Sequence, residues 1–472
     1  MSVIHFGTDG WRGTIAAEYT FENLRRVTQA VSGFLAKQYP RKGAVVIGYD
    51  RRFLSEAFAK ASAEVLAGNG FGVLLFSNPV PTPLVSFKIV REKALGGIVL
   101  TASHNPPEFH GFKFKEASGA SASSDTTRAI EALLGRSKVC SLSFEEGLRR
   151  KKIIYLSEER AYIPFLWRGF DRSLFKEARL HVLADSLYGS ASGYLWRALE
   201  YGSVRAETLH TERDVLFGGF SPEPIPKNLG ELMQEMRKRS YDLGVVVDGD
   251  GDRMAAVMPG GDFLPPSKIL ALLLYHLAAE KGLRGKVVKT VSGSMLIDRV
   301  ADAYGLSVEE SPIGFKHIAE KMARDPDFLI GGEESGGIGI RGHLPERDGI
   351  LAILFLLEAM AIRKKSMTQL LCVLRNRFGS FETDRLDIAF PKEKWKTLSR
   401  RLRRKAKELL LGETPSEMKD LDGLKLLGTE RWLMFRMSGT EPLLRIYAEG
   451  SSLQEVHRML QKGKRLAVSE LA

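Results

Sequence analysis

The chain contains 472 residues, 44% of them hydrophobic, and has a formal net charge of +12. This length predicts about three or four domains, and the apolar content excludes a disordered chain. The first residues, MSVIHFGTDGWRG, lack the apolar stretch of a secretory signal, and Cys140 and Cys372 lack the spacing of a metal site. We therefore expect a cytoplasmic protein with reduced thiols.

Much of the positive charge lies in two segments, 148-LRRKK-152 and 392-KEKWKTLSRRLRRKAKE-408. A basic balance is compatible with nucleic acid, an acidic surface or an anionic substrate as partner. The second segment has no set of aromatic residues for base stacking, and the sequence has no recognised nucleic-acid-binding motif. We therefore favour a solvated helix and expect no nucleic-acid partner, with a nucleic-acid footprint as the alternative.

Short β-branched segments alternate with amphipathic segments through most of the chain. The expected strands cover 44–50, 72–77, 96–103, 180–185, 243–250, 286–291 and 328–334. The clearest expected helices cover 55–70, 267–282 and 312–325. Strands separated by helices predict βαβ units and mostly parallel sheets. The last quarter differs, because 431–450 is typical of two strands joined by a turn and a helix is expected from 451 onward.

These patterns predict an α/β protein of four domains. Polar or glycine-rich segments divide the chain into three successive α/β domains of ordinary size and a smaller α+β domain at the C-terminal end. The expected ranges are 1–146, 147–257, 258–374 and 375–472.

The expected strand over 96–103 ends at Ser103, in 97-GIVLTASHNPPEFHGFKF-114. A serine at a strand end most often closes a turn. Ser103 and His104 are adjacent, so they do not form a nucleophile pair by themselves, and the G-x-S-x-G motif is absent. Lys113 follows in a glycine-containing turn and can act as an acid or base if burial or cations lower its pKa. Ser103 is therefore either a turn residue or a nucleophile.

Three aspartates alternate with glycine in 248-DGDGDR-253: Asp248, Asp250 and Asp252. In an extended chain such side chains point to one side, where they repel one another unless a cation is present. Oxygen ligands favour Mg²⁺, Mn²⁺ or Ca²⁺. An EF-hand is excluded, since Arg253 replaces its glycine and Pro259 its glutamate. The alternative is an acidic surface turn, but the upstream strand 243-LGVVV-247 favours a ligand site.

The segment 331-GGEESGGIGIRGHLPERDGI-350 is rich in glycine and carries Glu333, Glu334 and Ser335. Its G-x-G-x-x-G match does not open a helix after a strand, so a dinucleotide site is excluded. Carboxylates and a hydroxyl on a glycine frame suit the hydroxyl groups of a sugar. The alternative is an exposed acidic turn.

The apolar run 350-ILAILFLLEAMAI-362 is shorter than the roughly 18–20 residues of a membrane span, and Glu358 interrupts it. It predicts a buried helix, and we expect no membrane partner. Farther on, 436-RMSGTEPLLR-445 combines arginines and hydroxyls around a glycine turn, which predicts a phosphate site.

Together these segments resemble the α-D-phosphohexomutase family, in particular its phosphoglucomutase/phosphomannomutase branch. In chain order, 6-FGTDGWRGTI-15 resembles the family's N-terminal substrate segment, 101-TASHNPP-107 its phosphoserine loop, 248-DGDGDR-253 its metal loop, 332-GEESGG-337 its sugar loop and 438-SGTEP-442 its phosphate loop. The resemblance implies four domains around a central cleft, three similar α/β domains with mixed or parallel sheets and a C-terminal α+β domain.

The resemblance also implies a role for each matching residue. The phosphoryl group is expected on Ser103, and Mg²⁺ on the phosphoserine together with Asp248, Asp250 and Asp252. Proton transfer is assigned to Lys113, with His104 as a second candidate, and the transferring charge is stabilised by Arg12 and Arg253. Substrate contacts are assigned to Thr8, Gly314, Lys316, Glu333, Ser335 and, as a weaker candidate, Lys289. The phosphate that does not react is assigned to Arg436, Ser438, Gly439, Thr440 and Arg445.

The sequence departs from the family pattern at Gly337, where many bacterial relatives have histidine. His343 follows six residues later and is expected to contact the substrate in its place. The metal loop does not read D-G-D-A-D and the sugar loop does not read G-E-Q-S-G-H, which argues against glucosamine phosphate.

The resemblance implies that phosphorylated Ser103 passes its phosphoryl group to a hexose monophosphate. The 1,6-bisphosphate then turns over in the cleft and returns its other phosphate to Ser103. We expect interconversion of glucose 1-phosphate and glucose 6-phosphate by a monomer or homodimer, with glucose 1,6-bisphosphate as activator. Mannose or pentose phosphates are alternative substrates, and a phosphosugar phosphatase or a non-catalytic phosphosugar regulator are alternative functions.

Overall fold

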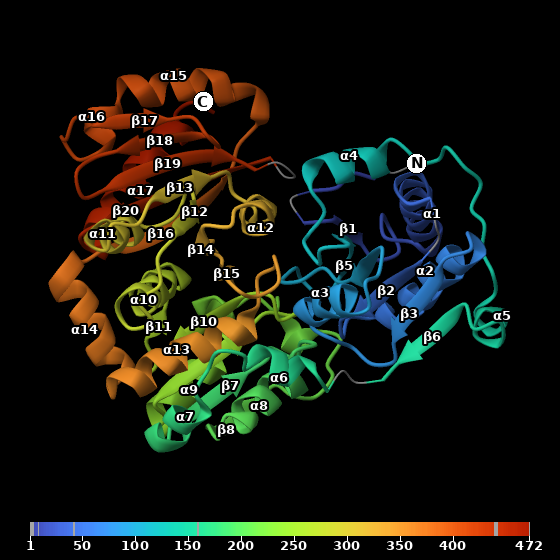
Figure 1. Ribbon diagram of the computed structural model, residues 1–472. Coiled ribbons are helices and arrows are strands. Elements are labelled where there is room, and N and C mark those ends of the chain that lie inside the picture. The colour runs from blue at the N-terminus through green and yellow to red at the C-terminus, as the bar shows by residue number, and fades with distance from the viewer. Residues whose placement is uncertain (1–3, 8, 41–42, 158–159, 439–441, 472) are drawn as a thin grey trace.

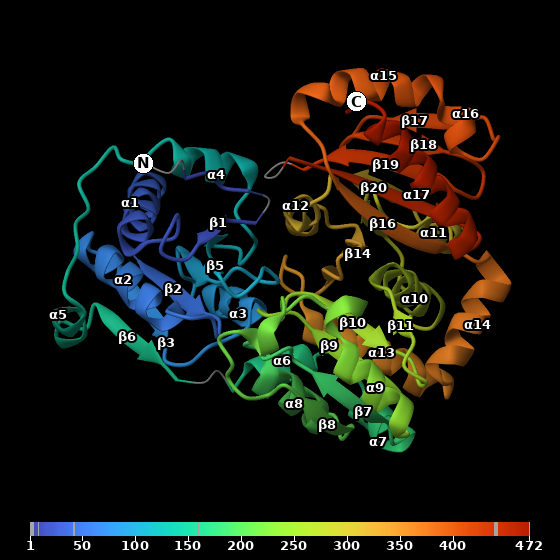
Figure 2. The same cartoon turned by 180° about the vertical axis from the view of Figure 1, so that it is seen from behind.

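The computed structural model describes residues 4–7, 9–40, 43–157, 160–438 and 442–471. These residues form four β-sheets that follow one another in the sequence. The sheets lie along an arc, with the first and the last at its two ends (Figures 1 and 2). The first three combine parallel and antiparallel strands with helices, and the fourth is antiparallel, as predicted.

The first sheet has six strands: β1 (Trp11–Thr14), β2 (Ala44–Tyr49), β3 (Gly72–Phe76), β4 (Gly96–Leu100), β5 (Phe109–Glu116) and β6 (Ile153–Leu156). Their spatial order is β1-β5-β4-β2-β3-β6. The helices of this region are α1 (Phe21–Gln38), α2 (Ser55–Gly68), α3 (Thr82–Arg91), α4 (Ser124–Glu131) and α5 (Phe144–Arg149). Because β2 and β4 are parallel, with Tyr49 opposite Leu100, residues 50–52 and 101–107 leave the sheet at the same edge.

The second sheet contains β7 (His181–Asp185), β8 (Arg205–Leu209), β9 (Leu243–Val247), β10 (Met254–Val257) and β11 (Phe263–Leu264), in the order β11-β10-β9-β7-β8. Its helices are α6 (Tyr162–Leu166), α7 (Arg172–Ala178), α8 (Ser192–Tyr201) and α9 (Gly230–Lys238), with 3₁₀ turns η1 (Phe217–Gly219) and η2 (Pro226–Asn228). The antiparallel pairing of β9 with β10 places residues 248–253 in a tight connection at the end of β9.

The third sheet contains β12 (Lys286–Thr290), β13 (Val308–Ser311), β14 (Phe328–Gly332) and β15 (Ile338–Ile340), in the order β13-β12-β14-β15. Its helices are α10 (Pro266–Ala279), α11 (Met295–Ala303), α12 (Phe315–Arg324) and α13 (Gly349–Arg363). The predicted sugar loop, 332–337, is the connection between β14 and β15.

The fourth sheet contains β16 (Glu382–Ala389), β17 (Glu417–Lys419), β18 (Leu424–Leu427), β19 (Trp432–Met437) and β20 (Leu443–Gly450), in the order β16-β20-β19-β18-β17. Helix α14 (Met367–Phe378) leads into it, and η3 (Lys392–Lys394), α15 (Trp395–Arg404), α16 (Ala406–Leu409) and α17 (Leu453–Val468) complete it. The hairpin and the final helix predicted from 431 onward are confirmed.

Helix α13 is the buried helix predicted from 350–362. All its residues from Gly349 to Leu354 and from Leu356 to Ala361 are buried, in a core that the second and third sheets share. A helix that is apolar on every side is stable in such a place, between neighbours. Within the described part of the chain, no helix has both the length and the hydropathy that a membrane span needs.

The predicted domain limits differ from the strand pairing at two points. β6 follows the limit at 146/147 but pairs with β3, and β11 follows the limit at 257/258 but pairs with β10. Helix α14 spans the third limit, at 374/375. Both strands are short, and the partner of a short edge strand depends on residues far away in the sequence. The ranges themselves stay a prediction.

His210, which follows β8, is held between two carboxylates. Its Nδ1 lies 3.0 Å from Asp185 Oδ1, and its Nε2 lies 3.1 Å from Glu231 Oε2. Burial alone would lower the pKa of His210, but hydrogen bonds and charge from Asp185 and Glu231 raise it to about 9. The folded protein therefore binds this proton more tightly than the unfolded chain, where the pKa is about 6.5.

We expect His210 to make stability depend on pH with a defined sign. Because its folded pKa is raised, its stabilisation is complete below about pH 6.5 and is lost as the pH rises to about 9. The His210→Asn variant should lose this part of the pH dependence. Urea unfolding of both proteins at several pH values measures it. Parallel stability curves for wild type and variant would contradict the expectation.

Candidate active site

Ser103 lies in the connection that follows β4, and it adopts an unusual backbone conformation. Its φ is 53°, in the left-handed region that residues other than glycine rarely adopt. Its N–H donates to Thr101 Oγ1 at 2.8 Å, and its hydroxyl donates to Asp248 Oδ2 at 2.8 Å. The residue is fully buried. The serine hydroxyl of the first sheet therefore meets the aspartate loop of the second.

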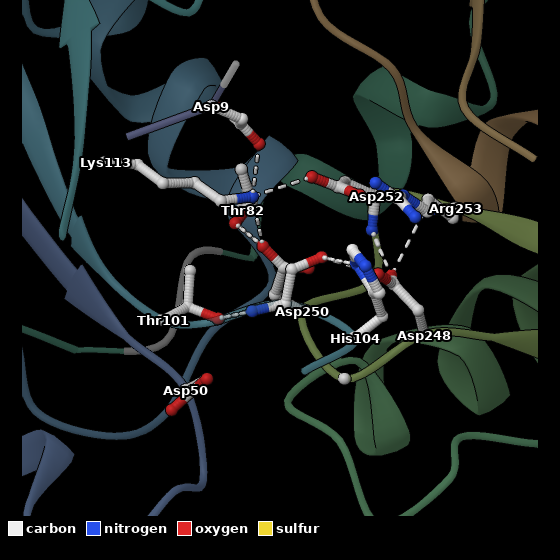
Figure 3. A network of polar contacts seen from close by, with 12 residues as sticks. Asp9, Asp50, Thr82, Thr101, His104, Lys113, Asp248, Asp250, Asp252 and Arg253 are labelled. Carbon is white, nitrogen blue, oxygen red and sulfur yellow. Dashed lines mark hydrogen bonds and ion pairs between the residues drawn. The ribbon is translucent and has the colours of Figure 1, made fainter. Parts of the chain in front are cut away.

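The three aspartates of that loop form one cluster, as predicted (Figure 3). One carboxylate oxygen from each lies within 4.8 Å of the others, and all three residues are fully buried. Asp248 Oδ1 accepts hydrogen bonds from the backbone N–H groups of Asp252 and Arg253. Asp250 Oδ1 and Asp252 Oδ1 have no hydrogen-bond partner among the described residues. This donor set of buried carboxylate oxygens fits a hard cation such as Mg²⁺.

The aspartates differ in their electrostatic environment. Burial and the repulsion of Asp250 and Asp252 raise the pKa of Asp248 well above its usual value. Burial also acts to raise the pKa of Asp252, but Arg347 and Lys113 outweigh it and hold that pKa below its usual value. In the absence of a cation, the ionised form of Asp248 is therefore disfavoured and that of Asp252 is favoured.

Lys113 lies in strand β5 and not in the turn that the sequence suggests. Its Nζ is 2.8 Å from Asp250 Oδ2, 3.0 Å from Asp252 Oδ2 and 2.8 Å from Asp9 Oδ2 (Figure 3). Burial opposes the charged ammonium group, but these three carboxylates outweigh it and raise the pKa of Lys113. The condition for acid or base chemistry by Lys113, a lowered pKa, is therefore not met in this structure, because three carboxylates lie within 3.0 Å of its Nζ.

The other predicted catalytic residues lie around Ser103. His104 Nδ1 is 3.4 Å from Ser103 Oγ. Burial, followed by the charges of Arg253 and Arg12, holds the pKa of His104 well below its usual value, so the imidazole is neutral. Arg12 Nη1 donates to Asn105 Oδ1 at 2.5 Å, which fixes it beside the same loop. The first and second sheets thus bring these groups together.

Arg347 contacts the aspartate cluster and the sugar loop, although the sequence did not predict it as a site residue. Its Nη2 lies 2.6 Å from Asp9 Oδ2 and 2.8 Å from Asp252 Oδ2, and its Nη1 lies 3.2 Å from Glu333 Oε2. A Cβ atom added at Gly337 would lie 2.6 Å from Arg347 Cδ. Arg347 therefore fills the space beside Gly337. In its segment, 342-GHLPERDG-349, only His343 was predicted to contact the substrate. No sequence pattern distinguishes Arg347 from the other arginines of the chain.

The predicted sugar loop lies beside Arg347. Glu333 is buried, and burial raises its pKa. Ser335 Oγ has no hydrogen-bond partner within the described parts of the chain. Gly314 precedes α12 and has a φ of 127°. Lys316 lies in the first turn of that helix. Its neighbour Phe315 has its ring centroid 5.4 Å from the Arg347 guanidinium.

Two further predicted substrate residues each have an acidic partner. His343 Nε2 is 3.0 Å from Asp348 Oδ2, and its ring packs on Phe165 of α6. Lys289 is buried and pairs with Asp298 in the first turn of α11. Asp348 is the neighbour of Arg347 in the chain, and Lys289 lies opposite Gly332 in the pairing of β12 with β14. The assignment of both residues to the substrate stays a prediction. Thr8 lies outside the described residues.

The predicted phosphate loop connects β19 with β20, where Arg436 lies opposite Arg445. Asp422 Oδ2 accepts from Arg436 Nε at 2.9 Å and from the N–H of Ile313 at 3.0 Å. One carboxylate therefore orients Arg436 and links the fourth sheet to the segment that precedes α12. Ser438 is buried at the end of β19, and Gly439 and Thr440 lie outside the described residues.

Four domain models of one protein family match the chain. Described as phosphoglucomutase/phosphomannomutase alpha/beta/alpha domains I, II and III and C-terminal domain, they match residues 3–138, 160–261, 265–377 and 394–462.

Individual proteins are similar over nearly their full length. A "Phosphoglucomutase/phosphomannomutase" of Thermococcus kodakarensis is 29% identical, with 98% of each chain covered. A "Probable phosphoglucosamine mutase" of Methanothermobacter thermautotrophicus is 31% identical, with 95% of this chain and 94% of that one covered. The crystal structure of a "putative phosphomannomutase" from Thermus thermophilus is 36% identical, covers 98% of this chain and 99% of its own, and superimposes with a TM-score of 0.86. The chain therefore belongs to the phosphoglucomutase/phosphomannomutase family of phosphohexomutases, which are isomerases that act by intramolecular phosphoryl transfer.

Proposed function

We propose that this protein moves a phosphoryl group between O1 and O6 of a hexose, through phosphorylated Ser103 and a bound 1,6-bisphosphate. The preferred reaction is the interconversion of glucose 1-phosphate and glucose 6-phosphate, with mannose phosphates as further substrates. The observation that carries the proposal is the 2.8 Å hydrogen bond from Ser103 Oγ to Asp248 Oδ2. It places a fully buried hydroxyl directly against the carboxylate cluster.

Phosphoryl transfer depends mainly on positioning and on neutralising charge. Asp248, Asp250 and Asp252, with an oxygen of phosphorylated Ser103, would hold Mg²⁺, which would neutralise charge on the transferring group. Arg12 and Arg253 supply further positive charge from the first and second sheets.

Among the two predicted proton-transfer residues, the geometry favours His104. Its neutral Nδ1, 3.4 Å from Ser103 Oγ, can accept a proton during transfer. Lys113, in contrast, is held charged by three carboxylates and is better suited to positioning Asp250 and Asp252. We therefore assign proton transfer to His104 first, which reverses the order that the resemblance implied.

The second phosphate needs a site of its own, because a 1,6-bisphosphate carries two phosphates at opposite ends. Arg436 and Arg445 lie on β19 and β20 of the fourth sheet and Ser438 follows β19, whereas Ser103 follows β4 of the first sheet, and these two sheets are the end members of the arc (Figure 2). We assign the phosphate that does not react to them, together with Gly439 and Thr440. Glu333 and Ser335 between the two ends suit the sugar hydroxyls.

A panel of sugar phosphates tests this function. We expect conversion of glucose 1-phosphate to glucose 6-phosphate that depends on Mg²⁺ and is primed by glucose 1,6-bisphosphate. Mannose 1-phosphate should react more slowly, and glucosamine and ribose phosphates should react poorly. Faster turnover of glucosamine 1-phosphate, in agreement with the name of one relative, would overturn the sugar preference but not the mutase mechanism. Release of inorganic phosphate at the rate of substrate loss would favour a phosphatase.

A further inference from the structure

Arg52 is a fully buried arginine directly after β2 that contacts the Ser103 loop and lies outside every motif described above. Its guanidinium donates to four backbone carbonyl oxygens of that loop. The acceptors are Ser103 O (2.7 Å), Asn105 O (2.6 Å), Pro106 O (2.7 Å) and Phe109 O (3.1 Å). One side chain therefore binds most of the length of the connection between β4 and β5.

These contacts have a specific physical consequence for Ser103. Residues 103–108 form neither strand nor helix, so their carbonyl groups lack the regular partners of secondary structure. Ser103 also keeps a left-handed conformation, which is strained for a residue other than glycine and persists only if the surroundings enforce it. Arg52 Nη2 binds the carbonyl group of Ser103 itself. The guanidinium thus holds the residue in the conformation in which its hydroxyl reaches Asp248.

Arg52 is itself fixed from two sides. Asp50 Oδ2 lies 3.2 Å from Arg52 Nε, and Asp50 Oδ1 accepts from the N–H of Arg52 at 2.9 Å. On the other side, the guanidinium lies 4.9 Å from the ring centroid of Phe217, which belongs to the second sheet's region. Arg52 therefore connects the Ser103 loop to both of the regions that meet at the active site.

A lysine does not reproduce this arrangement. A guanidinium is a planar fork with five N–H donors, and here it reaches four acceptors that lie apart from one another, whereas an ammonium group is a compact charge with three donors. A lysine at position 52 would keep the positive charge near Asp50 and release some of the carbonyl groups.

We propose that Arg52 is a positioning residue for phosphoryl transfer. It holds the Ser103 loop in its strained conformation, so that the serine oxygen stays aligned with the aspartate cluster. The proposal rests on the proposed role of Ser103 as phosphoryl carrier. It assigns to Arg52 an effect on the chemical step and not on substrate affinity, because Arg52 contacts the loop through its backbone carbonyl groups.

The test compares Arg52→Lys with a matched control, Arg363→Lys. Arg363 at the end of α13 is also a mostly buried arginine that pairs with a carboxylate, Glu280, and lies over an aromatic ring, Tyr275, but these partners belong to α10 and its C-cap in the region of the third sheet. A misplacement of about 1 Å costs about 100-fold in rate. We therefore expect kcat of Arg52→Lys to fall about 100-fold with KM nearly unchanged, while Arg363→Lys retains the wild-type values.

A second readout separates positioning from general stability. Phosphorylated enzyme is incubated without sugar, and the loss of phosphate from Ser103 is followed by intact mass. Because the Ser103 loop is no longer held in Arg52→Lys, the rate of phosphate loss in this variant should differ from that of the wild type. The rate in the control should equal that of the wild type. If Arg52→Lys does not fold, Phe217→Leu replaces it, because this variant removes only the aromatic ring that contacts the guanidinium. Its kcat should also fall, but by less than that expected for Arg52→Lys.

The outcomes are distinguishable. An Arg52→Lys enzyme with the kcat of the control, or one in which KM rises while kcat is unchanged, overturns the positioning role. Wild-type enzyme that neither carries phosphate on Ser103 nor interconverts glucose phosphates overturns the proposed function instead.

Discussion

Replacement of Ser103 with alanine is expected to reduce mutase turnover by at least about 10⁴-fold, as is typical when a covalent carrier is removed. The methyl group cannot carry a phosphoryl group, so the reaction loses its intermediate and not only a binding contact. The measurements are kcat for glucose 1-phosphate and the intact mass, which should lose the species heavier by one phosphate. Full turnover by the variant would contradict the mechanism.

Ser86→Ala is the matched control for this experiment. Ser86 is a second fully buried serine near the first sheet, in α3, and its Oγ has no hydrogen-bond partner in the described ranges. Its replacement removes the same atom from an equally buried position that is not hydrogen-bonded to the aspartate cluster, and the variant should keep its activity and its phosphorylated species. Equal losses in both variants would point to damaged folding and not to lost chemistry.

Replacement of Asp248 and of Asp252 with asparagine is expected to have the same effect on activity and opposite effects on stability. Each variant removes one oxygen ligand of the proposed Mg²⁺ site, and loss of several kcal/mol of charge stabilisation corresponds to about 10²- to 10³-fold in kcat. Without Mg²⁺, however, Asp248→Asn should unfold at a higher temperature than the wild type. Asp252→Asn should unfold at a lower one.

The physical reason lies in the opposite pKa shifts of the two carboxylates. Burial and its acidic neighbours raise the folded-state pKa of Asp248, so its ionisation at neutral pH destabilises the folded protein, and a neutral amide removes this effect. The pKa of Asp252 is held low against burial by Arg347 and Lys113, so its charge stabilises the fold. Its loss leaves two buried cations without one of their partners.

Calorimetry in the presence of a chelator, and again with Mg²⁺, measures this contrast. Mg²⁺ should raise the melting temperature of the wild type, because a ligand that binds only the folded state stabilises it, and should raise that of either variant much less. Melting temperatures that shift in the same direction for both variants without Mg²⁺ would show that the charges around the cluster do not act as described.

Most of the secondary structure follows from local patterns. The strands β2, β4 and β9 are buried, mainly apolar segments, as expected for strands that are covered on both faces. They begin at the predicted residues, but β4 ends at Leu100 and β9 at Val247, before the predicted limits at 103 and 250. The structure places Ser103 at the end of one and the aspartates at the end of another. Strand β5 was missed because its sequence, FHGFKFKE, has lysines at buried positions and reads as polar.

The sequence by itself therefore indicated the alternation of strands and helices and the family, and it singled out Ser103 and the three aspartates, because each of these signals is carried by short stretches of the chain. Only the tertiary structure decided that Arg347 and not His343 fills the space beside Gly337, that Lys113 is held charged by Asp9 and the aspartate cluster, and that Arg52 binds the Ser103 loop. These properties are sums of interactions between groups that lie tens to hundreds of residues apart in the chain. The strength of such interactions depends on distance and burial, which no local pattern encodes.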